Sequence, residues 1–159
     1  MHPEIKRSEE KKLLGINLSM SIVHNRTQEL WKTFMPRVSE INTRANNDFI
    51  SLQEYDPDYF DHFNPETSFV KWAAVEVDDF EQIPKGMETH IVVPGNYAVF
   101  HYKGLSSDKS IFQYIYGEWV PKSRYVLDNR PHFEVLGQNY RNNDPTSEEE
   151  IWIPIKQKL

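Results

Sequence analysis

The chain has 159 residues, of which 38% are hydrophobic and 13% aromatic, and its formal net charge is −6. The length suits a single domain, and the apolar share is large enough for a packed core, which excludes disorder over most of the chain. The densest basic stretch, Lys6-Arg7 with Lys11-Lys12, is interrupted by Glu9-Glu10. Because an acidic surface without a basic cluster repels a phosphate backbone, we predict no direct binding to nucleic acid.

Cysteine is absent, which excludes disulfides, thiolate metal sites and cysteine nucleophiles. Residues 1–12 are too polar for a signal peptide. The longest apolar runs are far shorter than the ~20 residues that a membrane-spanning helix needs. The sequence therefore predicts a cytoplasmic protein without a membrane partner.

The first half of the chain begins with residues 1–10, whose polarity predicts a flexible leader. A strand is expected next, because apolar residues alternate along it: Leu14, Ile16, Leu18 and Met20. A helix near Thr27–Ile41 follows from apolar residues at helical spacing: Leu30, Phe34, Val38 and Ile41. Pro36 should kink or restart this helix, since it lacks an N–H donor. Strands are then expected over residues 49–55 and 68–77.

The second half repeats this order. Strand-like segments cover residues 87–93 and 97–102. A helix over residues 107–119 is indicated by apolar residues four apart: Ile111, Ile115 and Trp119. Pro121 should end the helix, and strands are expected over residues 133–136 and 151–155.

Three landmarks align the two halves. Met35-Pro36 recurs 85 positions later as Val120-Pro121, and Trp72 recurs 80 positions later as Trp152. Phe49-Ile50-Ser51-Leu52 recurs 84 positions later as Phe133-Glu134-Val135-Leu136, which makes Ile50 the expected counterpart of Glu134. The repeat predicts an α+β fold of two βαββ units, about residues 11–80 and 87–157. Their strands should share one curved antiparallel sheet, with both main helices on one face.

Four phrases in order resemble the GyrI-like family, the effector-binding domains of bacterial transcription activators. They are Pro94-Gly95-Asn96-Tyr97-Ala98-Val99-Phe100-His101-Tyr102-Lys103-Gly104, Glu118-Trp119-Val120-Pro121-Lys122-Ser123-Arg124-Tyr125, His132-Phe133-Glu134-Val135, and Glu150-Ile151-Trp152-Ile153-Pro154-Ile155-Lys156. The first half is similar more loosely, through residues 30–34 and 69–77. The resemblance implies a duplicated βαββ fold with a ligand groove between the units. It also implies binding of hydrophobic, often cationic, small molecules, in transcription regulation or drug response.

Relatives in this family carry a helix-turn-helix module ahead of the domain. Too few residues precede Lys12 to hold one, so we expect a stand-alone sensor with a single domain over residues 11–159. A regulator or gyrase remains a possible protein partner, and the chain should be a monomer or a weak dimer.

Glu134 is the first candidate for a ligand-binding residue. The resemblance implies that the acid of the Phe-Glu phrase is the buried pocket carboxylate. A carboxylate among aromatic rings attracts a cation, and the rings add cation–π attraction. Strand alternation places Glu134 opposite Phe133 and Val135. An acid facing solvent from an edge strand is the alternative, since most acids are exposed.

Further candidates surround this acid in the predicted groove. Trp119, Tyr125 and Trp152 are expected as walls, although core packing is the commoner role of such rings. Tyr116 and Phe100 follow, and Glu150 is a second candidate for the acid. Glu148 and Glu149 read as the solvated part of a charge run.

No metal or cofactor is predicted. The six histidines lack the spacing of a zinc site, and Asp56, Asp58, Asp61 and Glu66 lack the glycine and spacing of a calcium loop. A Gly-rich phosphate loop and a nucleophile elbow are both missing.

Three roles stay open. The favoured one is a module that binds a small molecule in an aromatic groove with an acid. The second is a small-molecule hydrolase, in which Glu134 acts as general acid or base and Tyr125 or Tyr116 assists. The third is a protein-interaction module of the gyrase-inhibitor type, which would show a large exposed apolar patch.

Overall fold

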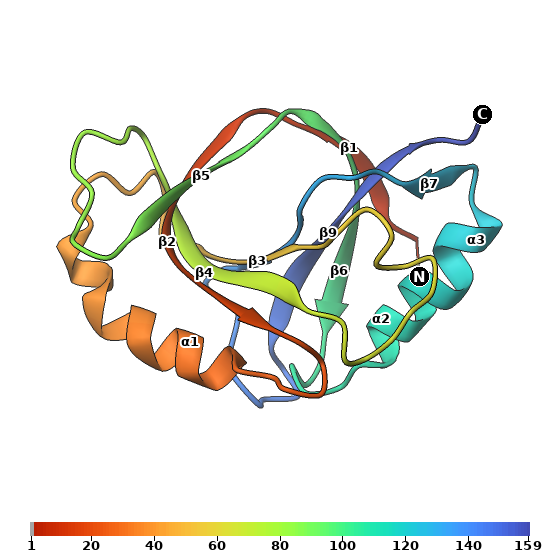
Figure 1. The fold of residues 1–159 in the computed structure, drawn as a ribbon, viewed down its shortest axis with the longest axis horizontal. Coiled ribbons are helices and arrows are strands. Elements are labelled where there is room, and N and C mark those ends of the chain that lie inside the picture. The colour runs from red at the N-terminus through yellow and green to blue at the C-terminus, as the bar shows by residue number, and fades with distance from the viewer. Residues whose placement is uncertain (1) are drawn as a thin grey trace.

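The structure is a computed structural model that describes residues 2–159. Over these residues the chain forms an α+β domain, in which a curved antiparallel sheet of nine strands packs against short helices (Figure 1). The strands are β1 (Glu4–Ser8), β2 (Lys11–Met20), β3 (Phe49–Glu54), β4 (Phe69–Val77), β5 (Glu88–Val92), β6 (Gly95–Lys103), β7 (Tyr125–Leu127), β8 (His132–Leu136) and β9 (Glu148–Gln157). The helical segments are α1 (Thr27–Phe34), the 3₁₀ turn η1 (Met35–Glu40), α2 (Ser110–Tyr114), the π turn η2 (Ile115–Trp119) and α3 (Val120–Lys122).

The predicted duplication is confirmed in the order of the elements. The first unit runs β2–α1–β3–β4 and the second runs β6–α2–β8–β9. The strand order in the sheet is β1-β6-β9-β8-β3-β4-β2-β5, and β7 pairs with β9 outside this path. The two units therefore meet where β3 pairs with β8, at the centre of the sheet.

The prediction of a flexible leader over residues 1–10 was wrong for Glu4–Ser8, which form β1 and pair with β6. The pairing uses backbone hydrogen bonds, which any side chain permits, so the polar composition of this segment did not reveal it. The strand Tyr125–Leu127 was missed for a related reason. Three residues are too few for a visible alternation, and their pairing with β9 is a tertiary contact.

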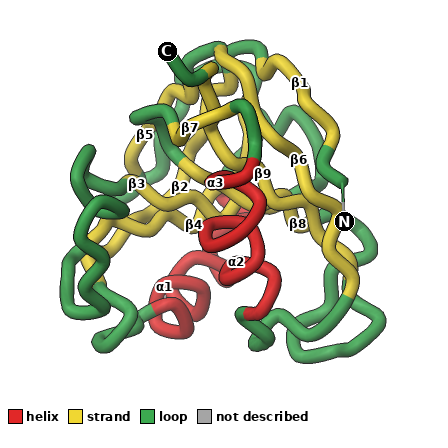
Figure 2. The backbone as a smooth tube through the Cα atoms, turned by 90° about the vertical axis from the view of Figure 1, so that its right-hand side faces the viewer, coloured by secondary structure: helices red, strands yellow, loops and turns green. Residues whose placement is uncertain are grey.

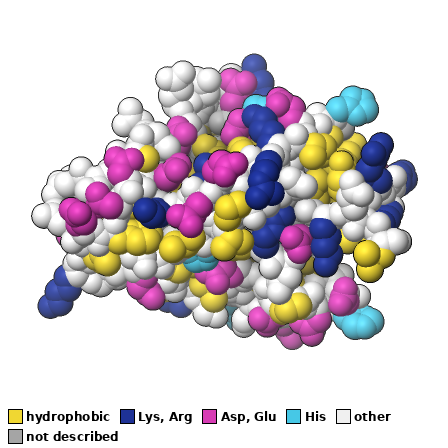
Figure 3. Space-filling model, turned by 90° about the horizontal axis from the view of Figure 1, so that it is seen from above, with side chains coloured by type: hydrophobic (Ala, Val, Ile, Leu, Met, Phe, Trp, Pro, Cys, Tyr) yellow, Lys and Arg dark blue, Asp and Glu magenta, His cyan; other side chains and the backbone are white. Residues whose placement is uncertain are grey.

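A two-stranded ribbon closes the sheet on itself. Ser8 pairs with Gly95, and three residues further on Lys11 pairs with Val92. The segment formed by β1 and β2 therefore pairs antiparallel with the segment formed by β5 and β6, in a continuous register. Pro94, which cannot donate a hydrogen bond, lies at the gap in this ribbon. Figure 1 shows the ribbon arching over the other strands, and Figure 3 looks down on it, with a band of Lys and Arg side chains across the middle of that face.

Closure gives the sheet an interior face and an outer face with different cores. The interior is filled by large apolar side chains from the ribbon and from the strands opposite: Leu13, Ile50, Leu52, Trp72, Ala74, Val92, Tyr97, Val99 and Phe133. On the outer face, α1 packs on β2 and β4 through Leu30 and Phe34, and α2 with η2 packs on β6 and β9 through Ile111 and Ile115. Figure 2 shows both helices on the same side of the strands, as the repeat predicted.

The helices differ from their predicted spans at their ends. The first helix changes to a 3₁₀ turn at Met35, where Pro36 occupies the first turn, so the predicted restart is confirmed. The second begins at Ser110 instead of residue 107, and Asp108 accepts a hydrogen bond from the Ser110 N–H at 2.9 Å. It runs on to Lys122, because a proline in the first turn of α3 needs no N–H partner.

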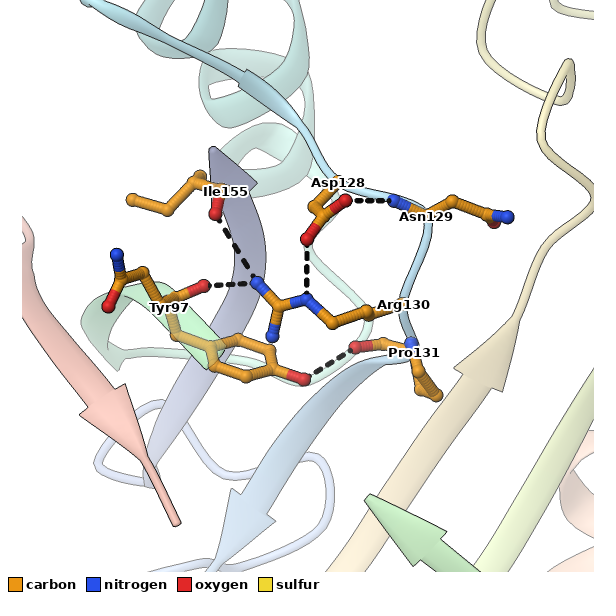
Figure 4. Close-up of polar contacts among 7 residues, drawn as sticks. Tyr97, Asp128, Asn129, Arg130, Pro131 and Ile155 are labelled. Carbon is orange, nitrogen blue, oxygen red and sulfur yellow. Dashed lines mark hydrogen bonds and ion pairs between the residues drawn. The ribbon is translucent and has the colours of Figure 1, made fainter. Parts of the chain in front are cut away.

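Arg130 fixes the end of the ribbon to the second unit (Figure 4). Its Nε donates to Asp128 Oδ2 at 2.7 Å, and its Nη2 donates to the backbone oxygens of Asn96 at 2.6 Å and Ile155 at 3.3 Å. The guanidinium also lies 4.7 Å from the centre of the Tyr97 ring. One side chain thus joins the connection before β8 to both β6 and β9.

None of the helices within residues 2–159 is long and apolar enough to span a membrane.

Candidate functional site

The outer face of β3 and β8 lies between the packing regions of the two helices. Ser51 pairs directly with Glu134, and Gln53 pairs with His132. Paired residues of an antiparallel sheet share a face, so these four side chains form the polar centre of the outer face. Ser51, Gln53 and His132 are buried, and Glu134 is partly buried.

The pairing corrects one detail of the predicted repeat. Ile50 belongs to the interior core, whereas Glu134 is on the outer face beside Ser51. Ile50 is therefore not the counterpart of Glu134 on the same face, and the outer-face residue that pairs with Glu134 is Ser51, one position further along the strand. The motif match Phe-Ile-Ser-Leu to Phe-Glu-Val-Leu hid this shift, because a slip of one residue exchanges the two faces of a strand.

Lys71 of β4 brings a positive charge to the same face. It pairs with Gln53, which in turn pairs with His132. Its Nζ donates a hydrogen bond of 3.2 Å to Thr27 Oγ1 at the start of α1. Burial lowers the pKa of Lys71, and the negative charge of Glu134 partly offsets that effect. The sequence reading missed Lys71, although it alternates with Phe69 and Ala73 on one face of its strand.

Glu149 of β9 is the second acid of the site. Burial and, to a lesser degree, the charge of Glu134 raise its pKa to about 7, against the opposing effect of Lys109 and Lys71. The prediction that Glu149 is solvated was wrong, because it shares the outer face with Ile151 and Ile153. That alternation was visible in the sequence, but the run of three acids concealed it.

An aromatic cluster adjoins these charges. It comprises Tyr55, Tyr59 and Phe60 from the β3–β4 connection, Tyr116 from η2, and His132. Phe60 stacks on Tyr116 at 4.8 Å and on His132 at 5.4 Å between ring centroids. Tyr116 Oη lies 2.7 Å from His132 Nδ1. Of the residues proposed from sequence, Glu134 and Tyr116 belong to the same site. The charge of Glu134 adds to the effect of burial, which raises the pKa of Tyr116.

His132 makes the protein sensitive to acid. Burial and, to a lesser degree, the charge of Arg130 lower its pKa to about 3, so the folded protein holds it neutral. The unfolded chain takes up a proton near pH 6.5, so the free energy of unfolding should fall as the pH drops from about 6.5 towards 3. We expect the urea midpoint to depend less steeply on pH in His132→Asn, which can still accept from Tyr116. His62→Asn, at an exposed position, is the control. An unchanged pH slope in His132→Asn would refute this assignment.

Two cavities border the charged and aromatic residues. One, of about 530 Å³, is lined on one side by Tyr55, Phe60 and His132 and on the other by α3 and β7. The other, of about 600 Å³, is lined by Glu149 together with residues of the β8–β9 connection. Glu134 lines neither cavity, but its charge acts on Tyr55 beside the first and on Glu149 beside the second.

The remaining predicted residues lie elsewhere. Trp152 and Glu150 are on the interior face, where Trp152 Nε1 donates to Glu150 Oε1 at 3.1 Å and the Trp152 ring stacks on Phe133. They lie on the opposite face from Glu134, which faces outwards from the neighbouring strand, but Glu150 also lines the 600 Å³ cavity together with Glu149. The other three rings, Phe100, Trp119 and Tyr125, pack around α2 and η2, and Tyr125 also lines the 530 Å³ cavity.

Comparison with known proteins agrees with this architecture. A family model described as a GyrI-like small molecule binding domain matches residues 1–156. The transcriptional regulator BrlR of Pseudomonas aeruginosa is 27% identical over 160 residues, which cover 98% of this chain and 56% of BrlR. The chain thus spans about half the length of this curated relative.

Solved structures show the same fold at low identity. The structure of SAV2435 bound to tetraphenylphosphonium has a TM-score of 0.73 at 16% identity, with 98% of this chain and 94% of that one covered. The C-terminal domain of EcmrR has a TM-score of 0.73 at 14% identity, with 99% and 98% covered. The chain therefore belongs to the family of GyrI-like small molecule binding domains.

Proposed function

We propose that the chain binds a small aromatic molecule that carries a positive charge, on the outer face of β3 and β8 between α1 and α2. The observation that carries this proposal is the meeting of two partly buried carboxylates, Glu134 and Glu149, with the aromatic cluster around Tyr116. Carboxylates in a partly dehydrated place attract a cation more strongly than exposed ones do, and rings add apolar contact and cation–π attraction. In this proposal the domain senses such a compound and passes the signal to transcription.

Two relatives support the proposal, one through its bound ligand and the other through its regulatory role. SAV2435, which shares the fold, was solved with tetraphenylphosphonium, a large aromatic cation. BrlR is a transcriptional regulator, and this chain matches about half of its length. Any output of this chain through DNA would then require a partner or a further module.

Calorimetric titration with tetraphenylphosphonium and with the neutral triphenylphosphine oxide tests the site. Glu134→Gln should weaken binding of the cation by about 1–3 kcal/mol, which is about fivefold to 150-fold in affinity, because one charge-assisted contact is lost. The neutral ligand should bind almost unchanged. Glu118→Gln removes an exposed acid from η2 and serves as the control. Equal losses for both ligands in Glu134→Gln would show that the residue shapes the site without acting through its charge.

The same titration should depend on pH. The cation should bind more tightly as the pH rises through about 7, because Glu149 then loses its proton and becomes negative. Glu149→Gln should remove that dependence. If the cation binds the unaltered protein nowhere between pH 6 and 9, the proposal fails.

A further inference from the structure

We propose that this site selects an amphoteric ligand, which places a positive group at Glu134 and Glu149 and a negative group at Lys71. The inference deepens the proposed function and rests on it. A lone acid in an aromatic site selects for a simple cation, whereas a site with fixed charges of both signs selects for a ligand with both.

The first observation is that Lys71 is underpartnered. An ammonium group has three N–H donors, and among the described residues Lys71 Nζ donates one hydrogen bond, to the neutral hydroxyl of Thr27 at 3.2 Å. Within residues 2–159, no carboxylate oxygen lies within the 4.0 Å of an ion pair from this nitrogen. A partly buried cation thus keeps donors that no acidic side chain satisfies.

The second observation is that Lys71 nevertheless shares its surroundings with both acids. The charges of Glu134 and Glu149 act on Lys71, and the charge of Lys71 acts on Glu149. The three groups come from β4, β8 and β9 and project from the same face of the sheet. Positive and negative groups therefore face one site without touching each other.

Such an arrangement is costly when the site is empty and favourable when it is filled. Partly dehydrated charges without ion-pair partners raise the free energy of the folded state. Ligand groups of opposite charge would form ion pairs with them and lower that free energy. A simple monocation gains at the two acids but is repelled by Lys71, with Lys109 nearby adding to the repulsion. A simple anion gains at Lys71 and is repelled by the two acids. Only a ligand with both charges gains at every group.

Two phosphonium ions of nearly equal shape separate these cases. Ethyltriphenylphosphonium carries only the positive charge, and (2-carboxyethyl)triphenylphosphonium adds a carboxylate on the same arm. Calorimetric titration at pH 8, where Glu149 is ionised, should show the carboxyethyl compound binding at least tenfold more tightly to the unaltered protein. In Lys71→Met the preference should vanish or reverse, because the carboxylate loses its partner and the ethyl compound loses a repulsion. Lys71→Arg keeps the charge and should keep the preference.

The controls distinguish this inference from the function on which it rests. Lys32→Met, at an exposed position of α1, should leave the ratio of the two affinities unchanged. If neither phosphonium ion binds the unaltered protein, the proposed function fails, and the inference fails with it. If both bind and the ethyl compound binds as tightly or more tightly, the inference is overturned while the proposed function stands. If Lys71→Met fails to fold by circular dichroism, Lys71→Gln replaces it, and retention of the tenfold preference in that variant would also overturn the inference.

Discussion

The variant Gly15→Ala should lose at least about 3 kcal/mol of unfolding free energy, the upper end of the usual cost of overpacking. A Cβ atom on Gly15 would lie 2.1 Å from the carbonyl oxygen of Ala73 and 2.7 Å from the Cα of Ala74. Both atoms belong to the backbone of β4, so no side chain can rotate away to make room. Relief requires β2 to separate from β4 at the point where Gly15 pairs with Ala74. Urea denaturation followed by circular dichroism measures the loss.

Gly117→Ala is the matched control for this substitution. A Cβ atom on Gly117 would meet nothing within 4 Å, and the residue lies in the π turn η2. Because alanine favours a helical backbone over glycine by up to about 1 kcal/mol, the variant should be as stable as the unaltered protein or slightly more stable. Similar losses in both variants would show that the loss in Gly15→Ala does not come from contact between β2 and β4.

Replacement of Arg130 should have the second large effect. Arg130→Met removes the donors to Asp128 and to the backbone oxygens of Asn96 and Ile155, and it leaves these acceptors without a replacement (Figure 4). Breaking a buried ion pair costs about 3–5 kcal/mol. We expect about 3 kcal/mol here, since the Asp128 side chain is 30% exposed and stays partly solvated. Thermal and urea denaturation should both show the loss.

The pH dependence of the same variant checks the cause. Burial by itself would raise the pKa of Asp128, but the hydrogen bond and charge of Arg130 hold it below its usual value. A carboxyl with a lowered pKa stabilises the folded state above its unfolded pKa of about 3.9 and loses that effect as the pH falls. The stability difference between Arg130→Met and the unaltered protein should therefore shrink below about pH 4. Arg124→Met, at an exposed position, should show no such difference at any pH. A loss in Arg130→Met that is constant down to pH 2 would contradict the role of the ion pair.

The sequence revealed most of the strands for a simple physical reason. Alternation of apolar residues in β2 and the proline and glycine punctuation around β6 are local features, and they do not depend on the rest of the chain. The sequence did not predict β1 and β7, because both strands are short and are specified by pairing with their partners β6 and β9.

The candidate site was predictable in part. The resemblance pointed to Glu134, and alternation placed it opposite Phe133, as in the structure. Trp152 was expected beside it, although the two lie on opposite faces of adjacent strands. Alternation within one strand shows which of its residues share a face. Only the register between two strands shows which residues of the neighbouring strand lie on that same face.

By itself, the sequence predicted the α+β class, the two βαββ units and the placement of Glu134 on the opposite strand face from Phe133, since local periodicity and family phrases carry that information. Only the tertiary structure decided that the ribbon of β1, β2, β5 and β6 closes the sheet, because that pairing joins segments about 80 positions apart. It also decided that Lys71 and Glu149 face the site with Glu134. These charges come from three strands that become neighbours through long-range hydrogen bonds, and no local pattern records the order in which those strands assemble.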